Sequence, residues 1–219
     1  MTNDLKLYTF KLCPFAHRVR LTLAEKGLSA ERIEVDLKNK PEEFVAISPH
    51  RRVPLLLHGE LRVWESAVIM AYLDEAFPTP SLMPSAPADR AQARLWIDFA
   101  DSRLFAATHR LIFERDEAQR GRLIEQMRGD IMVLDHALQS RHAQGFFLLG
   151  AQFSLADIAL YPWFEQLATL HKLSAFRMPA DCHHVYDWSD AVGARPAVKH
   201  CAQPDDWYEE NYRSYLAAA

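Results

Sequence analysis

Cys13 is the residue whose type and position point most directly to chemistry. It lies between an apolar, alternating run at 5–10 and an amphipathic run at 16–26, whose polar positions include Arg18 and Arg20. The first pattern predicts a strand and the second a helix, with Pro14 suited to the first helical turn. Free backbone N–H groups and the helix dipole at such a turn stabilise a thiolate and lower the pKa of a cysteine. The sequence therefore favours a reactive thiol, with a buried structural thiol as the alternative.

A proline opens another predicted strand, at 54–58. Composition alone favours a trans Val53–Pro54 bond, because only about 5–6% of X-Pro bonds in folded proteins are cis. A cis bond would turn the backbone groups of Val53 outward, where they could pair with an extended peptide.

Glu65 and Ser66 lie at a second predicted strand-to-helix turn. Ser66 is a good N-cap, and Glu65 is electrostatically favourable beside a helix N-terminus, so that capping alone explains both residues. The functional alternative is an anion site. There the free N–H groups and the Ser66 hydroxyl would receive a ligand carboxylate, and Glu65 would bind a ligand ammonium.

Three other motifs favour structural roles. Ser154-Leu155-Ala156-Asp157 has the pattern of a capping box that begins a helix. Cys182-His183-His184 lacks a second ligand cluster at suitable spacing, and surface histidines in an irregular segment explain it better than a metal site. We expect core positions for the aromatic residues of the first long helix, which are Trp96, Phe99, Phe105 and Phe113.

The composition is that of an ordinary globular chain. Its 219 residues carry a net charge of −4, with 49% apolar and 25% charged residues. This charge gives no reason to expect nucleic acid or an anionic membrane as a partner. No apolar run approaches the roughly 20 residues that span a bilayer, and residues 1–4 lack the features of a secretory signal. Three widely spaced cysteines make no disulfide framework, and a reducing cytoplasm is the simplest setting.

The turns at Cys13 and at Glu65-Ser66 lie in an N-terminal part with alternating strands and helices. The predicted order is β-α-β-α-β-β-α, a small mixed sheet with helices packed on it. Residues 78–87 contain four prolines and predict a linker rather than a helix. The predicted strands are 5–10, 32–37, 54–58 and 61–64, with helical segments at 16–26, 41–47 and 66–76.

Beyond the linker the pattern is helical. Long helices are predicted over 88–113, 117–138 and 154–170, and the last is apolar enough to be the buried centre of its domain. The tail from 179 is expected to be irregular, with short helices near 188–192 and 206–216.

Together these motifs resemble the cytosolic glutathione transferases over nearly the whole chain. The Cys13-Pro14-Phe15 turn is most similar to the omega-type enzymes, which include dehydroascorbate reductases and glutathione-dependent thioltransferases. The resemblance implies an α/β thioredoxin-like domain over 1–77, a linker over 78–87 and an all-α domain with a co-substrate pocket over 88–219. It also implies a homodimer and glutathione as co-substrate, without a metal.

The resemblance assigns roles by position. Cys13 would form a mixed disulfide with glutathione or hold its thiolate, and Phe15 would line the site beside it. Lys40 is similar to the lysine that reaches the glycyl carboxylate of glutathione in this class.

The remaining positions would bind the other end of glutathione. Val53, preceding a cis-Pro54, would pair through its backbone with the cysteinyl part. Glu65 and Ser66 would hold the γ-glutamyl ammonium and carboxylate. The basic pair Arg51-Arg52 departs from the pattern and would contact glutathione, an acidic co-substrate or solvent.

No second cysteine follows Cys13 at Cys-x-x-Cys spacing, which leaves a monothiol mechanism. The resulting hypothesis is a glutathione-dependent thiol transferase that reduces mixed disulfides or dehydroascorbate. The alternatives are conjugation or isomerisation of a small electrophile, and a non-catalytic module similar to RNA polymerase-associated stress proteins of this fold.

Overall fold

The computed structural model describes residues 4–217, which divide into two compact units. Of these residues, the first unit contains 4–83 and Pro196–Cys201, and the second contains Pro84–Arg195 and 202–217. The first three residues, which bear on the expectation about a secretory signal, lie outside the described part.

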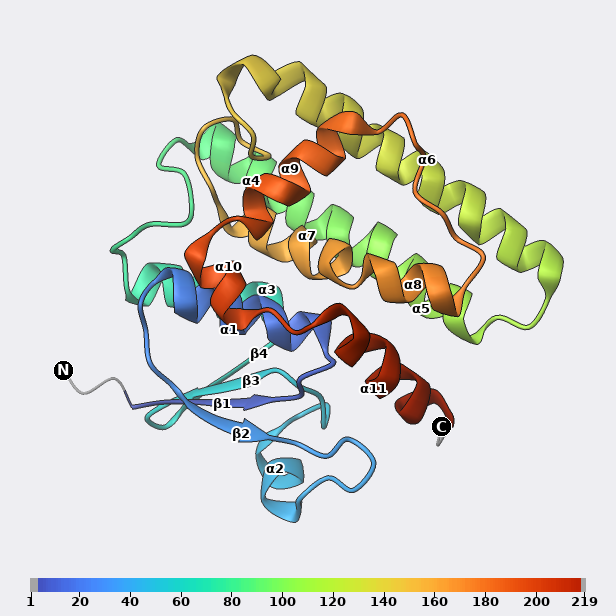
Figure 1. Ribbon diagram of the computed structural model, residues 1–219. Helices are drawn as coiled ribbons and strands as arrows, with labels where there is room; N and C mark the ends of the chain where they lie inside the picture. The colour runs from blue at the N-terminus through green and yellow to red at the C-terminus, as the bar shows by residue number, and fades with distance from the viewer. Residues whose placement is uncertain (1–3, 218–219) are drawn as a thin grey trace. The chain divides into compact units, whose positions relative to one another are not determined.

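The first unit is built on a four-stranded sheet with the order β2-β1-β3-β4 (Figure 1). β1 pairs in parallel with β2 and antiparallel with β3, and β3 pairs antiparallel with β4. Leu7 at the middle of β1 lies opposite Arg32 of β2 and Leu56 of β3. The strands are β1 Leu5–Thr9, β2 Glu31–Glu34, β3 Leu55–His58 and β4 Leu61–Trp64.

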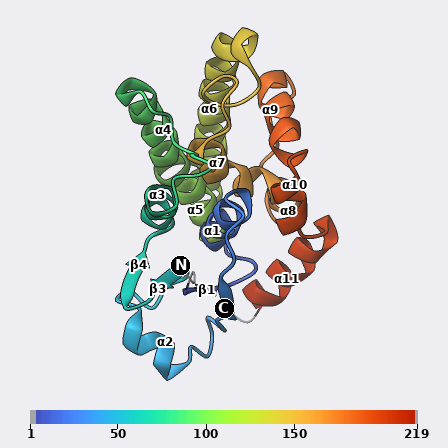
Figure 2. The ribbon, with the colours of Figure 1, turned by 90° about the vertical axis from the view of Figure 1, so that its left-hand side faces the viewer.

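Helices cover both faces of this sheet. Figure 2 shows α1 and α3 on one side of it and α2 on the other. The βαβαββα order predicted from the sequence is confirmed, and α10 from late in the chain packs beside α1. The helices are α1 Pro14–Glu25, α2 Glu42–Ile47, α3 Ser66–Ala76 and α10 Pro196–Cys201.

Each face of the sheet buries its own apolar cluster, because successive strand residues point to opposite faces. Leu5 and Leu7 pack with the apolar residues of α1 and α3, including Val19 and Ile69. On the other face lies a cluster of Tyr8, Val35, Phe44, Val53 and Leu55. The burial of these side chains supplies the main stabilising free energy of the unit.

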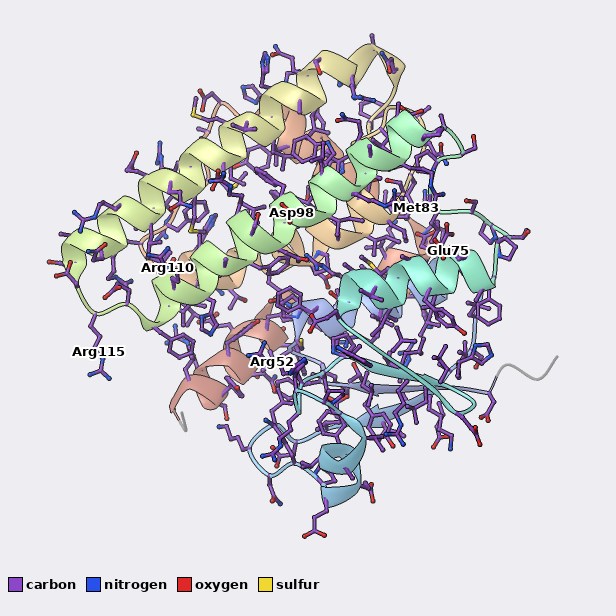
Figure 3. The ribbon with its side chains drawn as sticks, turned by 180° about the vertical axis from the view of Figure 1, so that it is seen from behind. Arg52, Glu75, Met83, Asp98, Arg110 and Arg115 are labelled. Carbon is purple, nitrogen blue, oxygen red and sulfur yellow. The ribbon has the colours of Figure 1, made fainter. Side chains whose placement is uncertain are left out.

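The proline-rich segment after α3 is not helical, as predicted, and its backbone is hydrogen-bonded to a buried ion pair of the first unit. Lys26 Nζ lies 2.8 Å from Asp74 Oδ1 and also donates to the Pro80 carbonyl at 2.6 Å. The backbone N–H groups of Leu82 and Met83 donate to the Asp74 carboxylate. Met83 is labelled at this segment in Figure 3. Lys26, the C-cap residue of α1, and Asp74 of α3 thus fix the path of the chain as it leaves α3.

The second unit begins with a long helical rod in the predicted region 88–113. Its middle is π-helical over Ala100–Phe105, between α4 and α5. Figure 3 shows Asp98 before this segment and Arg110 after it. The rod's α-helical parts are α4 Pro87–Phe99 and α5 Ala106–Phe113, followed by α6 Glu117–Arg141 and a 3₁₀ turn at His142–Gln144.

The expected core positions on this rod are only partly correct. Phe105 is buried, Trp96 and Phe99 are half-buried and pack edge to face, and Phe113 is exposed. Phe113 is the last residue of α5, where no further turn of helix follows to cover it.

The centre of the second unit is α7, Leu155–Glu165, in which ten of eleven residues are buried. The predicted capping box is confirmed, with Ser154 and Asp157 bonding reciprocally. A single helix over 154–170 is wrong, because the chain breaks at Gln166 and continues as α8, Leu167–Leu173. The side chain of Gln166 accepts a hydrogen bond from Tyr212 at 2.8 Å.

The two short helices expected in the tail, near 188–192 and 206–216, are confirmed but are longer than predicted, and the expectation that the rest of the tail is irregular is wrong where α10 forms. Besides α10, the tail contains α9 His183–Gly193 and α11 Asp205–Ala217. The buried residues of α9 are at helical spacing, so burial of this face stabilises the helix. They are Val185, Trp188 and Val192. Among the described residues, no helix has the length and apolar character that crossing a bilayer requires.

Candidate active site

Cys13 lies at the N-cap of α1, with Pro14 as the first helical residue. Its backbone N–H donates to the Phe10 carbonyl at 3.0 Å, and its own carbonyl accepts from His17 N–H at 3.0 Å. The predicted strand-to-helix turn is therefore confirmed. The turn holds the thiol at the end of α1 where backbone N–H groups have no partner within the helix.

The electrostatics of the thiol differ from the expectation. Although Cys13 keeps part of its surface exposed, loss of water around the sulfur raises its pKa above the ordinary value. The backbone N–H groups of Ala16 and Phe15 and the charges of Arg20 and Arg18 act in the opposite direction. The predicted lowering of the Cys13 pKa is wrong, because desolvation of the thiol outweighs the stabilisation of the thiolate by the helix N-terminus and the two arginines.

Val53 contributes a backbone partner of the thiol from a distant part of the sequence. Cys13 Sγ lies 3.9 Å from the Val53 carbonyl oxygen, which is 40 residues away in sequence. The Val53–Pro54 bond is cis, so the trans form favoured by composition is wrong and the form implied by the resemblance is present. Both residues are buried at the start of β3. The fold thus brings the reactive turn and the cis-proline turn together.

The second strand-to-helix turn has a different capping arrangement from the predicted one. Glu65 occupies the N-cap position of α3, and Ser66 is the first helical residue. Glu65 is exposed with a φ of 64°, and its side chain makes no capping hydrogen bond. Ser66 as the N-cap is therefore wrong. Its hydroxyl accepts a hydrogen bond of 3.2 Å from Arg18 Nη1 instead.

Arg18 links this hydroxyl to the cysteine turn. Its guanidinium lies 5.0 Å from the centre of the Phe15 ring, a cation–π distance, and its side chain is completely buried. The helical pattern placed Arg18 and Arg20 on a polar face, yet both are buried. Sequence reasoning therefore missed the contact between Arg18 and Ser66, since 48 residues separate them and neither forms a recognisable motif with the other.

Within residues 4–217, the side chains of Lys40 and Glu65 make no hydrogen bond or ion pair to the cysteine turn or to Ser66. Lys40 is half-buried in the segment before α2. Arg51, with a φ of 53°, and Arg52 are exposed, and Figure 3 shows Arg52 just before β3. The basic pair is therefore accessible to solvent.

The Cys182-His183-His184 motif lies at the start of α9 rather than in an irregular segment. Cys182 is buried, and His184 Nδ1 lies 3.3 Å from Asp135 Oδ2. In the described part of the chain, no three His, Cys, Asp or Glu side chains are placed to hold a metal ion.

The arrangement in the first unit suits thiol chemistry on a small peptide. A thiol at a helix N-terminus can act as nucleophile in disulfide exchange. The backbone at a cis-proline turn can pair with an extended ligand. A second helix N-terminus with a buried hydroxyl can receive a carboxylate.

The chain matches two family models. One describes the glutathione S-transferase N-terminal domain, over residues 7–81, and the other the glutathione S-transferase C-terminal domain, over residues 116–191. A probable glutathione S-transferase of Glycine max is 30% identical over 99% of this chain and 97% of its own length. Glutathione S-transferase omega-1 of Sus scrofa is 34% identical over 76% of this chain and 68% of its own.

A solved structure of a glutathione S-transferase is also similar to this chain. Rice glutathione S-transferase 1 in complex with glutathione is 30% identical, covers 94% of this chain and 93% of its own, and has a TM-score of 0.84. The protein therefore belongs to the glutathione S-transferase family.

Proposed function

We propose that the protein is a glutathione-dependent thiol transferase of omega-like type, with Cys13 as nucleophile. The observation that carries this proposal is the placement of the thiol of a partly exposed cysteine at the N-cap of α1, 3.9 Å from the Val53 carbonyl oxygen. Similarity to an omega-class relative supports the same assignment.

Glutathione is the proposed co-substrate, which the related rice enzyme binds. Its cysteinyl part would pair with the backbone of Val53 before the cis bond to Pro54. Its γ-glutamyl carboxylate would accept from the Ser66 hydroxyl and the N-terminus of α3, with Glu65 taking the ammonium. Phe15 would line the site.

Lys40 would bind the glycyl carboxylate. Its half-buried position before α2 leaves the ammonium accessible to an anion. A lysine in a loop can reach such a group because its long side chain has several rotatable bonds.

The proposed reaction has two exchange steps. The Cys13 thiolate attacks the glutathionyl sulfur of a mixed disulfide, the disulfide bond breaks, and the substrate thiolate leaves with the electron pair. A glutathione thiolate then attacks the glutathionyl sulfur bound to Cys13, which releases glutathione disulfide and restores the Cys13 thiolate. Reduction of dehydroascorbate to ascorbate would instead take two electrons and two protons from two free glutathione molecules, which leave as glutathione disulfide.

Conjugation of a small electrophile is the second candidate. Its specific support is the burial that raises the pKa of Cys13, because a protonated thiol can donate to a glutathione thiolate instead of attacking. In that reaction glutathione is the nucleophile, and Cys13 only orients it.

One comparison separates the two reactions. The glutathione-dependent reduction of hydroxyethyl disulfide and the conjugation of 1-chloro-2,4-dinitrobenzene are measured for the wild type, Cys13→Ala and Cys13→Ser. Thiol transfer predicts that both variants lose reduction, with Cys182→Ala as a control that keeps it. Conjugation that persists in Cys13→Ser, with no reduction in the wild type, would establish the second candidate.

We further propose a homodimer, with domains over 1–77 and 88–219 and a co-substrate pocket in the latter. Large exposed apolar side chains on the first unit support a covered surface there. They are Leu61, Trp64 and Val68. Light scattering after size-exclusion chromatography should give twice the chain mass, and the chain mass alone would contradict a dimer.

A further inference from the structure

We propose that Arg20 is the positioning residue of the reactive cysteine, and that its guanidinium holds the turn between β1 and α1 in the geometry that thiol transfer requires. This inference rests on the proposed role of Cys13 as nucleophile and adds a residue that does not contact glutathione. The geometry around Arg20 carries it.

The guanidinium of Arg20 gathers four acceptors around the turn. Nη1 donates to Thr9 Oγ1 at 2.8 Å and to the Phe10 carbonyl at 3.3 Å. Nη2 donates to the Lys11 carbonyl at 3.1 Å and lies 3.1 Å from His17 Nδ1. These partners come from the end of β1, from the turn itself and from the first turns of α1.

The position of Cys13 depends directly on this turn. Cys13 N–H donates to the Phe10 carbonyl, the same oxygen that Arg20 binds, and Cys13 O accepts from His17 N–H. Arg20 therefore binds the residues on both sides of the cysteine that fix its backbone. A shift of the Phe10 carbonyl would move the thiol relative to Val53.

The shape of the guanidinium matters as well as its charge. Arginine presents five N–H donors in a rigid planar fork, whereas a lysine ammonium is a compact charge with three donors on a flexible stem. Because arginine can only donate, His17 Nδ1 must accept from it, and the ring proton then lies on Nε2. The Nδ1 atom of His17 is thus used for positioning and is not available to take the thiol proton.

The charge of Arg20 acts on the same thiol. It is one of the two cations that oppose the effect of burial on the pKa of Cys13, the other being Arg18. Other titratable or charged groups around Arg20 and the turn come from several elements. Among the described residues they include Glu34 of β2, which accepts from Lys11 N–H at 2.6 Å, Lys11, His17 of α1, and Cys201 of α10, whose sulfur lies 3.8 Å from the Arg20 carbonyl.

Two substitutions separate charge from shape. Arg20→Gln removes the charge, and Arg20→Lys keeps the charge but loses the fork. The rate of Cys13 alkylation by iodoacetamide is measured from pH 5 to 10 without glutathione, with Cys13→Ala as background, so that the readout does not depend on thiol transfer. Hydroxyethyl disulfide reduction gives kcat and the KM for glutathione. Arg32→Gln, an exposed arginine on β2, is the matched control.

The expected results differ for each variant. Arg20→Gln should move the alkylation profile to higher pH and slow the reaction at pH 7 by roughly three- to tenfold. Arg20→Lys should keep the wild-type profile but lower kcat for reduction by roughly tenfold, with the KM for glutathione changed by less than about twofold. The control should match the wild type in all three quantities.

Other outcomes overturn the inference. A folded Arg20→Gln protein with the wild-type alkylation profile would show that the charge of Arg20 does not affect the thiol. A wild-type kcat for Arg20→Lys would show that Arg20 does not position the cysteine. The Arg20→Lys measurement remains decisive if Arg20→Gln does not fold. If the wild type itself does not reduce disulfides, the proposed function fails, yet the alkylation profiles still test the effect of Arg20 on the thiol.

Discussion

Arg18 Nη1 donates a hydrogen bond of 3.2 Å to Ser66 Oγ, between two buried side chains that are 48 residues apart in sequence. Because the guanidinium can only donate, the Ser66 oxygen is the acceptor, and its own O–H proton is directed elsewhere. This proton and the N-terminus of α3 are the groups that we expect to hold a ligand carboxylate. The contact thus prepares one end of the proposed glutathione site.

Replacement of Ser66 by alanine should therefore weaken glutathione binding. Loss of a hydrogen bond to a charged group costs roughly 1.5–3 kcal/mol, so the KM for glutathione should rise about 10-fold or more while kcat changes little. Steady-state kinetics with varied glutathione measures both. Ser140→Ala on α6, where the hydroxyl bonds only to its own helix, is the matched control. An unchanged KM in Ser66→Ala would contradict the assignment of Ser66 to this site.

The ion pair between Lys26 and Asp74 should matter for stability because both side chains are buried. Lys26→Met leaves the carboxylate without its cation and should lower the free energy of unfolding by about 3–5 kcal/mol. Urea denaturation followed by circular dichroism measures the loss. The exposed pair Lys6–Glu31, at 3.1 Å, is the comparison, and Lys6→Met should have little effect. Equal losses in the two variants would show that the burial of the first pair is not what makes it important.

Asp157 should be the more important of two helix-capping aspartates. Its buried carboxylate accepts from Leu148 N–H, from the backbone and side chain of Ser154, and from Trp188 Nε1. Asp157→Ala leaves these buried donors unpaired and should cost at least about 3 kcal/mol. Asp116→Ala, which removes an exposed cap of α6, should cost only about 1 kcal/mol. Thermal and urea unfolding compare the two, and a similar cost for both would refute the importance of the buried network.

Alkaline pH should destabilise the protein through its buried thiols. Burial raises the pKa of Cys182 to about 11, whereas an unfolded cysteine titrates near about 8.5. Between these values the native state binds more protons than the unfolded state, so stability falls as pH rises and the loss is complete above about pH 11. The contribution of Cys182 amounts to up to about 3 kcal/mol.

The raised pKa of Cys13 acts in the same direction. Unfolding free energies of the wild type and Cys182→Ala should therefore be compared at pH 7, 9 and 10.5. The variant should show a smaller decrease with pH, and parallel curves would contradict the role of Cys182.

Local patterns in the sequence were enough to predict the order of helices and strands in the first unit. Alternation and turn residues predicted the βαβαββα order, and the position of Cys13 between a strand and a helix followed from patterns within about 15 residues. The capping box of Ser154 and Asp157 is equally local. Such features depend on backbone conformation and nearest neighbours, which a single segment contains.

Tertiary structure decided the features that depend on distant residues. The burial of Arg18 and Arg20 depends on acceptors from β1 and α3, and the helix pattern alone placed both on a polar face. The direction of the Cys13 pKa depends on how much water the whole unit removes from the thiol. α9 extends beyond the short helix predicted near 188–192 because its apolar face, with Val185, Trp188 and Val192, is buried. Desolvation and long-range hydrogen bonds arise only when remote segments pack together, so no local pattern of residues contains them.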